Sequence, residues 1–526
     1  MKGKTVLMAG VAAVALVASS DAGLAKTKHH PAPTPSYDTS SPPASASNGP
    51  SNAELAARLA AVEEELAADH NKRDADHNRL SALDQDFHET TWSFDNGRPT
   101  IKSGDGRFSM SIRARFQSDF AGFMQSTTHP AGFNGPADLS SGAVIRRAYL
   151  GIEGTAYRDF QYEIRLNGGG SDGGNNGAGG VPNAGEGDPL VNKAQITYTG
   201  IPHWHASVGV LEPALMFEGT TSSASLIFME RPEIDNIAAD AFGAGDSRRG
   251  FELGWQHSDM LWSGDNINIT TAFTGGKTGS TAGHGNGGDE QSQLLGRISD
   301  RLWTDGAGSN IAIGASGSNV FYSGNGAGGG SQTLRFRDRP EIRVDGTRLI
   351  DTGGIAAKTG HMFGLDAGGN WQNFFVGGEW AQFTADRLVG GVVADHPNFS
   401  GWYAEASWIL TGESKTYSVS AINNEVGGFQ APVPSVPFSF DGNSWGAWEL
   451  AARYSNTDLN WHMTLANGIF GGDERVVAIA LNWYLNRNIR VMIDDNIVKV
   501  NKTVFGGATN QNQDLNIVGL RFQYAN

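Results

Sequence analysis

The stretch Arg107–Asp119 alternates strictly between apolar and polar residues. Such a period of two places successive side chains on opposite faces and predicts a β-strand. Two later stretches, Ile145–Asp159 and Phe160–Asn167, have the same character. In the first strand one face is wholly apolar, whereas the other carries Arg113 and Arg115. Strands with one apolar and one polar face are typical of the wall of a transmembrane barrel that encloses a water-filled lumen.

The rest of the chain continues this pattern to its end, and sixteen strands are predicted in all. After the first three they are Val191–Thr199, His205–Leu211, Arg249–Ser258, Asn266–Thr274, Ser292–Arg301, Asn310–Phe321, His361–Asn370, Asn373–Ala385, Ser400–Thr411, Gly446–Ser455, Val476–Tyr484, Ile489–Val500 and Asp514–Tyr524. The fold class is therefore all-β, a 16-stranded antiparallel transmembrane β-barrel. A barrel of this size encloses an aqueous channel. The Gly-rich stretches 168–188, 275–289 and 323–331 are interpreted as flexible external loops.

Composition agrees with this interpretation. Beyond the N-terminus no segment approaches the roughly 20 consecutive apolar residues that a membrane helix needs. The sequence contains no cysteine, which fits a protein that crosses an oxidising periplasm without disulfides. Its net charge of −16 argues against nucleic acid as a partner. There is no Ser/His/Asp grouping, metal-ligand cluster or paired carboxylates at a suggestive spacing, so neither an enzyme nor a cofactor is expected.

The N-terminal region precedes the barrel in three parts. Residues 1–25 have a charged start, an apolar core and small residues, and predict a secretory signal. Residues 26–50 are rich in Pro, Ser, Thr and Ala, which is typical of a linker. Residues 51–90 predict a periplasmic coiled-coil helix, and residues 91–526 the barrel.

The predicted helix has a heptad stripe of apolar residues. Leu55, Leu59, Val62 and Leu66 follow one another at alternating steps of four and three, and the stripe resumes at Leu80, Leu83 and Phe87. A stripe of this kind needs a partner, because an isolated helix would expose it to water. One interpretation is self-association, most economically as a trimer; the alternative is a single helix packed on the barrel.

Arginines recur on the polar faces of the first three strands, which face the lumen. They are Arg113 and Arg115 on the first strand, Arg147 on the second and Arg165 on the third. Arg146 is out of phase and needs either a β-bulge or a position beyond the membrane band to join them. Arginine suits an anion pore because it replaces lost hydration with five donors and keeps its charge. Alternatively, these arginines pair with lumen carboxylates and merely solvate the wall.

A second group of arginines, Arg335, Arg337, Arg339 and Arg343, lies at odd positions of one segment. An extended segment would place them on one side, and Pro340 excludes a central strand. The segment is therefore predicted to lie along the pore, where a row of arginines lets an anion step between sites. A basic surface loop that binds lipopolysaccharide phosphates is the alternative.

Several motifs, in one order, resemble the phosphate-selective porins (the porin O and P group) of Gram-negative outer membranes. They include Arg115-Phe-Gln-Ser-Asp119, Arg146-Arg-Ala-Tyr-Leu150, Gly154-Thr-Ala-Tyr-Arg-Asp159, Met229-Glu-Arg231, Leu334-Arg-Phe-Arg-Asp-Arg-Pro340 and Leu481-Asn-Trp-Tyr484. The resemblance implies a homotrimer of 16-stranded barrels in the cell outer membrane, each conducting inorganic phosphate or similar small anions. It also implies outer-membrane lipid and lipopolysaccharide as surroundings, with peptidoglycan as a candidate contact of the helix.

The same resemblance implies that the connection Glu212–Arg248 folds inward and narrows the pore. The family's phosphate-specific members carry a lysine in this loop where this chain has Gly219, and an aspartate where it has Asn192, beside Lys193. Arg231 matches the family, and both Arg231 and Lys193 are candidate anion-binding residues of the pore. These departures imply weaker phosphate binding or a different preferred anion. The alternative function is a general or carboxylate-selective porin whose coiled coil tethers the envelope.

Overall fold

The computed structural model describes residues 50–95, 97–125, 138–169, 191–245, 247–277, 288–325, 332–419, 427–464, 467–503 and 511–526. The predicted signal lies outside these residues, as does the linker except for Pro50. The chain divides into two compact units, Met1–His77 and Asn78–Asn526.

A long helix, α1 (Asn52–His88), occupies the region where the sequence predicts one. Leu55, Leu59, Val62, Leu66 and Leu80 of the heptad stripe are between 50% and 65% exposed in the single chain. Self-association of this stripe remains a prediction. Within the described residues, no helix is long and apolar enough to span a membrane.

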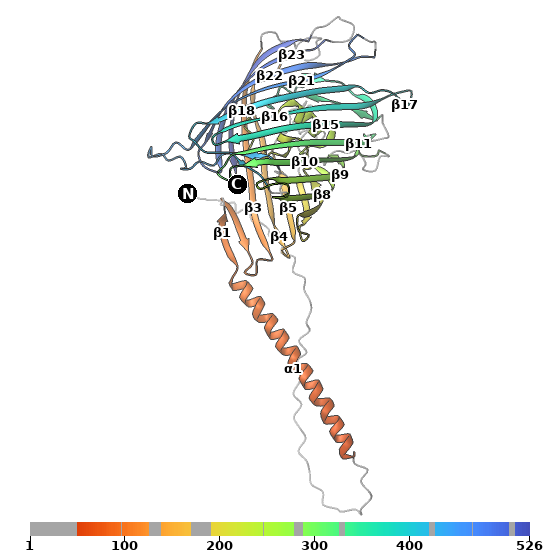
Figure 1. Ribbon diagram of the computed structural model, residues 1–526, viewed down its shortest axis with the longest axis vertical. Coiled ribbons are helices and arrows are strands. Elements are labelled where there is room, and N and C mark those ends of the chain that lie inside the picture. Colours follow the sequence, from red (N-terminus) through yellow and green to blue (C-terminus); the bar gives the residue numbers. More distant parts are fainter. Residues whose placement is uncertain are drawn as a thin grey trace, which may run out of the picture. The chain divides into compact units, whose positions relative to one another are not determined.

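The second unit is built on a closed ring of antiparallel strands (Figure 1). The main sheet has 20 strands, of which β1, β2, β12 and β17 are short additions, and the other sixteen close because the last pairs with the first. These sixteen are β3 (Ser109–Gln125), β4 (Gly142–Ala156), β5 (Phe160–Asn167), β6 (Val191–Tyr198), β7 (Trp204–Leu211), β8 (Arg248–Ser258), β9 (Asn266–Lys277), β10 (Ser292–Thr304), β11 (Asn310–Tyr322), β15 (Ile355–Trp371), β16 (Phe374–Val389), β18 (Asn398–Ile409), β21 (Ala447–Trp461), β22 (Ile469–Tyr484), β23 (Ile489–Asn501) and β24 (Gln513–Ala525). The predicted 16-stranded barrel is thus confirmed.

The two faces of the wall differ as the alternation requires. In β18 every second residue is buried and the intervening ones are exposed. In β3 the side chains of Met110, Ile112 and Phe116 face outward, each at least 37% exposed. Arg115, Gln117 and Asp119 are buried on the inner side of the same strand. The apolar band therefore faces lipid and the polar side chains face the lumen.

Some short strands were not expected from the sequence. A hairpin of β1 (Thr91–Asp95) and β2 (Arg98–Lys102) extends the edge of β3. β17 (Val392–Asp395) pairs with the end of β16 in the connection to β18. The predicted Gly-rich external loops lie largely outside the described residues, although 275–277 belongs to β9.

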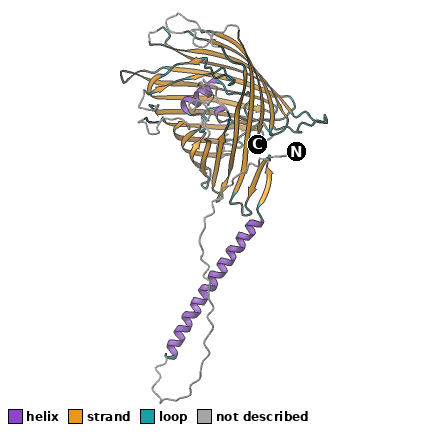
Figure 2. Ribbon diagram, turned by 180° about the vertical axis from the view of Figure 1, so that it is seen from behind, coloured by secondary structure: helices purple, strands orange, loops and turns teal. Residues whose placement is uncertain are grey.

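The connection between β7 and β8 folds into the barrel, as the resemblance implied. It contains α2 (Phe217–Thr220) and α3 (Glu233–Phe242), most of whose side chains are buried. Figure 2 shows both helices within the ring of strands. Side chains of the wall form hydrogen bonds with the backbone of this connection. Asn482 Nδ2 donates to Ile227 O at 2.9 Å, and Asp494 accepts from Met229 N at 2.6 Å. This pairing satisfies backbone groups that the lumen would otherwise leave unbonded.

A glycine of the wall permits the close approach of α3. A Cβ atom at Gly401 of β18 would lie 2.5 Å from Ile234 Cγ2 and 2.9 Å from Asn456 O. Both separations are shorter than van der Waals contact, so a side chain here would push the helix off the wall.

The connection between β11 and β15 also carries short strands, β12 (Thr333–Leu334), β13 (Arg337–Asp338) and β14 (Ile350–Asp351). Phe336 of this segment is fully buried and packs on Phe242 of α3 and on Phe383 and Phe399 of the wall. The segment lies inside the barrel, beside the β7–β8 connection.

The connection 410–446 breaks the alternation of short turns and long loops. It leaves β18 at the end of the barrel that carries the short turns, yet it is long and includes β19 (Thr416–Tyr417) and β20 (Phe429–Gln430). Phe429 meets Phe217 of α2 edge to face, with ring centroids 6.1 Å apart, and Lys415 pairs with Glu449 at 2.9 Å. Connections from both ends of the barrel therefore meet in the lumen.

The seam between β24 and β3 carries a buried ion pair. Arg521 and Asp119 are register partners, and both side chains are fully buried. Arg521 donates from Nε and Nη2 to the two carboxylate oxygens of Asp119, at 2.6 Å each, and Nη2 also lies 2.6 Å from Glu230 Oε1. The pair therefore links the two closing strands of the barrel to the β7–β8 connection.

Replacing Arg521 by Met should lower the free energy of unfolding by about 3–5 kcal/mol, because the buried carboxylate of Asp119 would lose its ion-pair partner and Glu230 one of its four arginines. The control is Arg335→Met. It breaks the ion pair between Arg335 and Asp351, in which the Arg335 side chain is 46% exposed. An exposed pair contributes only about 0–1 kcal/mol. Urea unfolding of the protein in detergent micelles measures both, and equal losses would contradict the role given to the seam.

Candidate functional site

A cavity of about 170 Å³ lies in the lumen between the wall strands β3–β5 and the two inward connections. We call it the basic cavity, because ten arginines and one lysine line it against four carboxylates. The cations are Arg113, Arg115, Arg146, Arg147, Arg165, Arg231, Lys277, Arg337, Arg339, Arg343 and Arg348, and the carboxylates are Glu212, Glu230, Asp240 and Asp338. A water-filled space with this balance has a positive potential.

Strand β4 contributes two neighbouring arginines to the same side of the wall. Pairing with β3 shifts register here: Gln117 pairs with Arg147 and Ser118 with Ile145, so Arg146 is the extra residue of a β-bulge. Both arginines are consequently buried on the lumen side. A β-bulge thus explains why Arg146 faces the lumen although it is out of phase with the alternation of its strand.

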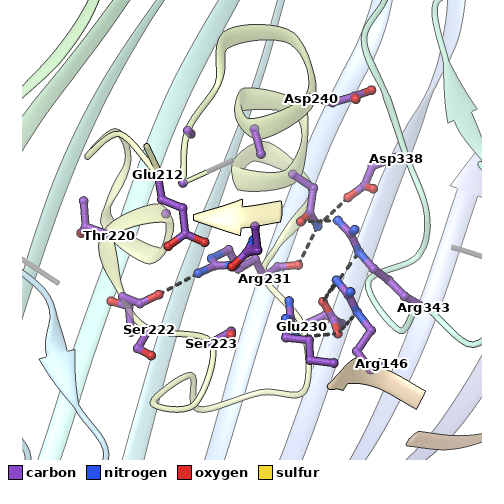
Figure 3. A pocket seen from close by; sticks show the side chains of 18 of the residues that line it. Arg146, Glu212, Thr220, Ser222, Ser223, Glu230, Arg231, Asp240, Asp338 and Arg343 are labelled. Atoms are coloured by element: carbon purple, nitrogen blue, oxygen red, sulfur yellow. Dashed lines mark hydrogen bonds and ion pairs between the residues drawn. The ribbon is translucent and has the colours of Figure 1, made fainter. Parts of the chain in front are cut away.

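Glu230 is the centre of an arginine cluster (Figure 3). Arg146 Nε donates to Glu230 Oε1 at 2.9 Å, and Arg343 Nε lies 3.6 Å from the other oxygen. Arg147 and Arg521 approach the same carboxylate, at 3.7 and 2.6 Å. Burial would raise the pKa of Glu230, but these four charges outweigh it and hold that pKa well below its usual range. The carboxylate therefore stays ionised and orients the guanidinium groups around it.

Strand β5 places Arg165 beside a second carboxylate, Glu212, to which it donates a hydrogen bond. Its Nε donates to Asn192 Oδ1 at 2.5 Å. Asn192 is the extra residue of a bulge between β5 and β6, so both it and Lys193 turn inward. Lys193 does not border the cavity; it is 1% exposed and pairs with Glu163 at 2.9 Å.

Other arginines of the cavity donate to uncharged oxygens. Arg115 donates to the hydroxyls of Ser223 and Ser222, at 2.6 and 2.8 Å. Arg231 donates to the carbonyls of Glu218 and Thr221, at 2.6 and 2.7 Å. Hydroxyls and carbonyls hold a guanidinium in place without neutralising its charge. These contacts therefore hold the two guanidinium groups at the wall of the cavity.

The row predicted from Arg335 to Arg343 is only partly present. Arg337, Arg339 and Arg343 line the cavity, but Arg335 lies outside it and pairs with Asp351. Glu341 has a left-handed φ of 58°, so the segment bends after Pro340 and does not remain extended. The alternate spacing holds for Arg337 and Arg339 alone, and Arg343 reaches the cavity from beyond the bend.

The structure thus brings nine of the eleven predicted residues to one cavity, and leaves out Lys193 and Arg335. It adds Lys277, at the end of β9, and Arg348, in the inward connection before β15. The sequence analysis missed both, because neither belongs to an alternating run of arginines. Gly219 also lines the cavity, which agrees with the narrowing role implied for its loop. Among the described residues, no group of three or more His, Asp or Glu could hold a metal ion.

Comparison with known proteins agrees with this architecture. The family model described as phosphate-selective porin O and P matches residues 110–525. An uncharacterized protein of Caulobacter vibrioides is 25% identical over 83% of this chain and 76% of its own length. Porin O of Pseudomonas aeruginosa is 24% identical over 74% of this chain and 83% of its own.

Among solved structures, the anion-selective porin from Comamonas acidovorans is 13% identical, with a TM-score of 0.46, over 80% of this chain and all of that one. The family match covers nearly the whole barrel, including the strands and inward connections that form the basic cavity. This chain therefore belongs to the phosphate-selective porin O and P family, and it is an outer-membrane porin.

Proposed function

We propose that this porin passively conducts small anions, inorganic phosphate among them, and that the basic cavity is the selective part of its lumen. The observation that carries this proposal is the excess of eleven cationic side chains over four carboxylates on the cavity wall. A narrow aqueous space within a low-dielectric wall concentrates such a field, so anions are enriched and cations are excluded.

The arrangement of donors supports passage as well as attraction. An anion entering the cavity loses part of its hydration, which the forked donors of arginine replace. The lining arginines come from three parts of the chain: Arg115 from the wall strand β3, Arg231 from the β7–β8 connection (the inward loop), and Arg337 and Arg339 from the β11–β15 connection. Several neighbouring sites of this kind let an ion exchange partners and leave, whereas one deep site would retain it.

The pairing of some arginines favours a second candidate, a general or carboxylate-selective porin. Arg146 and Arg165 are engaged by Glu230 and Glu212, and such pairs reduce the field that reaches the lumen. The departures at Gly219 and Asn192 point the same way, because they remove charges that the family's phosphate-specific members use. Reversal potentials in a salt gradient distinguish the two candidates.

We also propose that α1 self-associates as a trimeric coiled coil on the periplasmic side. The exposed stripe of Leu55, Leu59, Val62 and Leu66 supports this, since burial of each leucine or valine contributes about 1.5–3 kcal/mol. Such a coil would hold three barrels together and place a rigid rod near the cell wall.

The first test neutralises the cavity row. Replacing Arg337, Arg339 and Arg343 together by Gln removes three charges while keeping most of the size and hydrogen bonding. The anion-over-cation permeability ratio should fall about ten-fold, the low end of the enrichment expected in a charged cleft. Raising the ionic strength should shrink the wild-type ratio as the charges become screened.

The control for this test is Arg335→Gln, which removes one positive charge from the same segment but outside the cavity. Its permeability ratio should be close to that of the wild type. Planar-bilayer reversal potentials give both ratios, and heat-modifiable gel mobility verifies that each barrel is folded. A triple variant that retains the full ratio would place selectivity elsewhere.

The second test introduces a lysine at Gly219, where the family's phosphate-specific members carry one. A Cβ atom there would lie 3.4 Å from Met216 Cβ and 3.6 Å from Ala244 Cβ, which is ordinary contact. Gly219→Lys should make phosphate block chloride current at an about ten-fold lower concentration, because a charge-assisted hydrogen bond is added. Gly219→Gln supplies the length without the charge. Equal block by the two variants, or block unchanged from wild type, would mean that charge at this position does not govern phosphate binding.

The third test concerns the helix. A peptide of residues 51–90 should sediment as a trimer, and Leu59→Asp with Leu66→Asp should make it monomeric, because both changes bury charges in the seam. Ala60→Asp with Ala67→Asp makes the same charge change next to the stripe and should leave the trimer intact. A monomeric unmodified peptide at high concentration would refute self-association of the helix.

A further inference from the structure

A second cavity lies in the lumen, toward the end of the barrel that carries the short turns. Its volume is about 220 Å³, and strands β3, β4, β5 and β6 line it. Alternation along β3 gives Ser109 and Ser111 the same inner face as Arg113. We call this space the hydroxyl cavity, because its lining includes the hydroxyls of Ser109, Ser111, Thr155 and Thr197 and the amides of Gln161 and Gln195.

One arginine stands between this cavity and the basic cavity. Arg113 borders the basic cavity, and its Nη1 donates to Glu153 Oε2 at 3.1 Å and lies 3.6 Å from Glu163 Oε1. Both of these carboxylates border the hydroxyl cavity. Arg165, which also borders the basic cavity, lies 3.5 Å from the same oxygen of Glu163. The two cavities are therefore neighbours, separated by one layer of paired side chains.

The two carboxylates of the hydroxyl cavity are already compensated by cations. Arg98, from the hairpin of β1 and β2, donates to Glu153 at 2.5 Å, and Lys193 pairs with Glu163 Oε2 at 2.9 Å. Together with the two arginines at the border, four cations face two carboxylates. The cavity therefore offers no site for the cationic group of a solute, and what it offers instead is a set of uncharged hydrogen-bonding groups.

The hydroxyls of the cavity keep capacity for a solute. Ser109 and Thr155 share one hydrogen bond at 2.8 Å, and Thr197 shares one with Ser207, also at 2.8 Å. A hydroxyl group donates once and accepts twice, so each of these pairs can bind further partners. The two glutamine amides add donors and acceptors of their own. A lining of this kind suits the hydroxyl groups of a sugar or polyol.

The spacing of the two cavities sets the size of a solute that occupies both. Arg113 and Ser111 are two residues apart on β3, which corresponds to about 7 Å along the strand. A chain of about six atoms covers this distance, as two extended residues do.

We propose that the two cavities together bind phosphorylated sugars or polyols of about six carbons, with the phosphate among the arginines and the hydroxyls in the hydroxyl cavity. This assignment rests on the anion conduction proposed above, and it adds the class of solute. A small inorganic anion would use the basic cavity alone, whereas a phosphorylated polyol gains hydrogen bonds in the second space.

Two phosphate monoesters isolate the contribution of the hydroxyl groups. Inositol 1-phosphate and cyclohexyl phosphate share one carbon ring and one phosphate, and only the first carries further ring hydroxyls. At pH 8 both carry about two negative charges, because the second pKa of a phosphate monoester is about 6. In planar bilayers that contain the whole protein, inositol 1-phosphate should block chloride current at an about ten-fold lower concentration, as one or two net hydrogen bonds supply.

Thr155→Val and Gln161→Leu remove hydrogen-bonding groups of the hydroxyl cavity without changing its charge. Each should weaken block by inositol 1-phosphate about three-fold, as the loss of one hydrogen bond predicts, and should not weaken block by cyclohexyl phosphate. The two variants are independent, so one that fails to fold leaves the other, and heat-modifiable gel mobility identifies the folded one. Thr270→Val is the matched control. It makes the same chemical change on the inner side of β9, outside both cavities, and should leave the preference intact.

Equal block by the two esters in the wild type would overturn the inference and leave the proposed anion conduction standing. A full preference in every folded variant of the hydroxyl cavity would overturn it too, since the hydroxyls would then bind elsewhere. The same holds if unphosphorylated inositol blocks at the concentration of its phosphate, because the basic cavity would then have no share in binding. Absence of block by both esters would likewise overturn it, and the reversal potential in a salt gradient then shows whether the proposed anion conduction fails as well.

Discussion

The buried contact of Arg521 with Asp119 and Glu230 is the interaction on which the rest of the lumen depends. It lies where the last strand meets the first, and the same guanidinium reaches the inward loop. Breaking a buried ion pair leaves an uncompensated charge, so the three groups constrain one another strongly. This contact therefore fixes three features together: the closure of the wall, the depth of the loop in the lumen, and the orientation of Arg146, Arg147 and Arg343.

The inward loop (the β7–β8 connection) also separates a basic side of the lumen from an acidic side. Toward β3–β5 it presents Arg231, Ser222 and Ser223, and there the cations prevail. Toward β16, β18 and β22 it presents Asp235, Glu218 and Glu233, which face the wall carboxylates Glu379, Glu405 and Glu474. A net charge of −16 for the chain is therefore compatible with a positive cavity, because only four carboxylates line the cavity and the other acidic groups lie elsewhere.

The wall could be predicted from the sequence because each strand carries its own signal. A period of two indicates which face a residue occupies. The break in this period at Arg146 indicated a β-bulge or a position beyond the membrane band, and the structure has the bulge. The inward connections carry no such period. The bend at Glu341 and the outward position of Arg335 depend on contacts with distant strands.

The same reason explains two further differences. The connection 410–446 looks like any other loop in the sequence, since its contacts with Phe217 and Glu449 are invisible to a local pattern. The hairpin of β1 and β2 is short and stands next to a long helix, so its residues were assigned to no strand. Lys193 was predicted to line the pore, but it pairs with Glu163 outside the basic cavity, and this contact could not be foreseen from the sequence.

The meeting of Phe217 with Phe429 has a consequence for how the protein is assembled. These rings come from connections at opposite ends of the barrel, so their contact links the two ends through the lumen. The seam likewise pairs residue 119 with residue 521. Contacts between residues so far apart in the sequence form more slowly than local ones. We therefore expect closure of the barrel to require the complete chain.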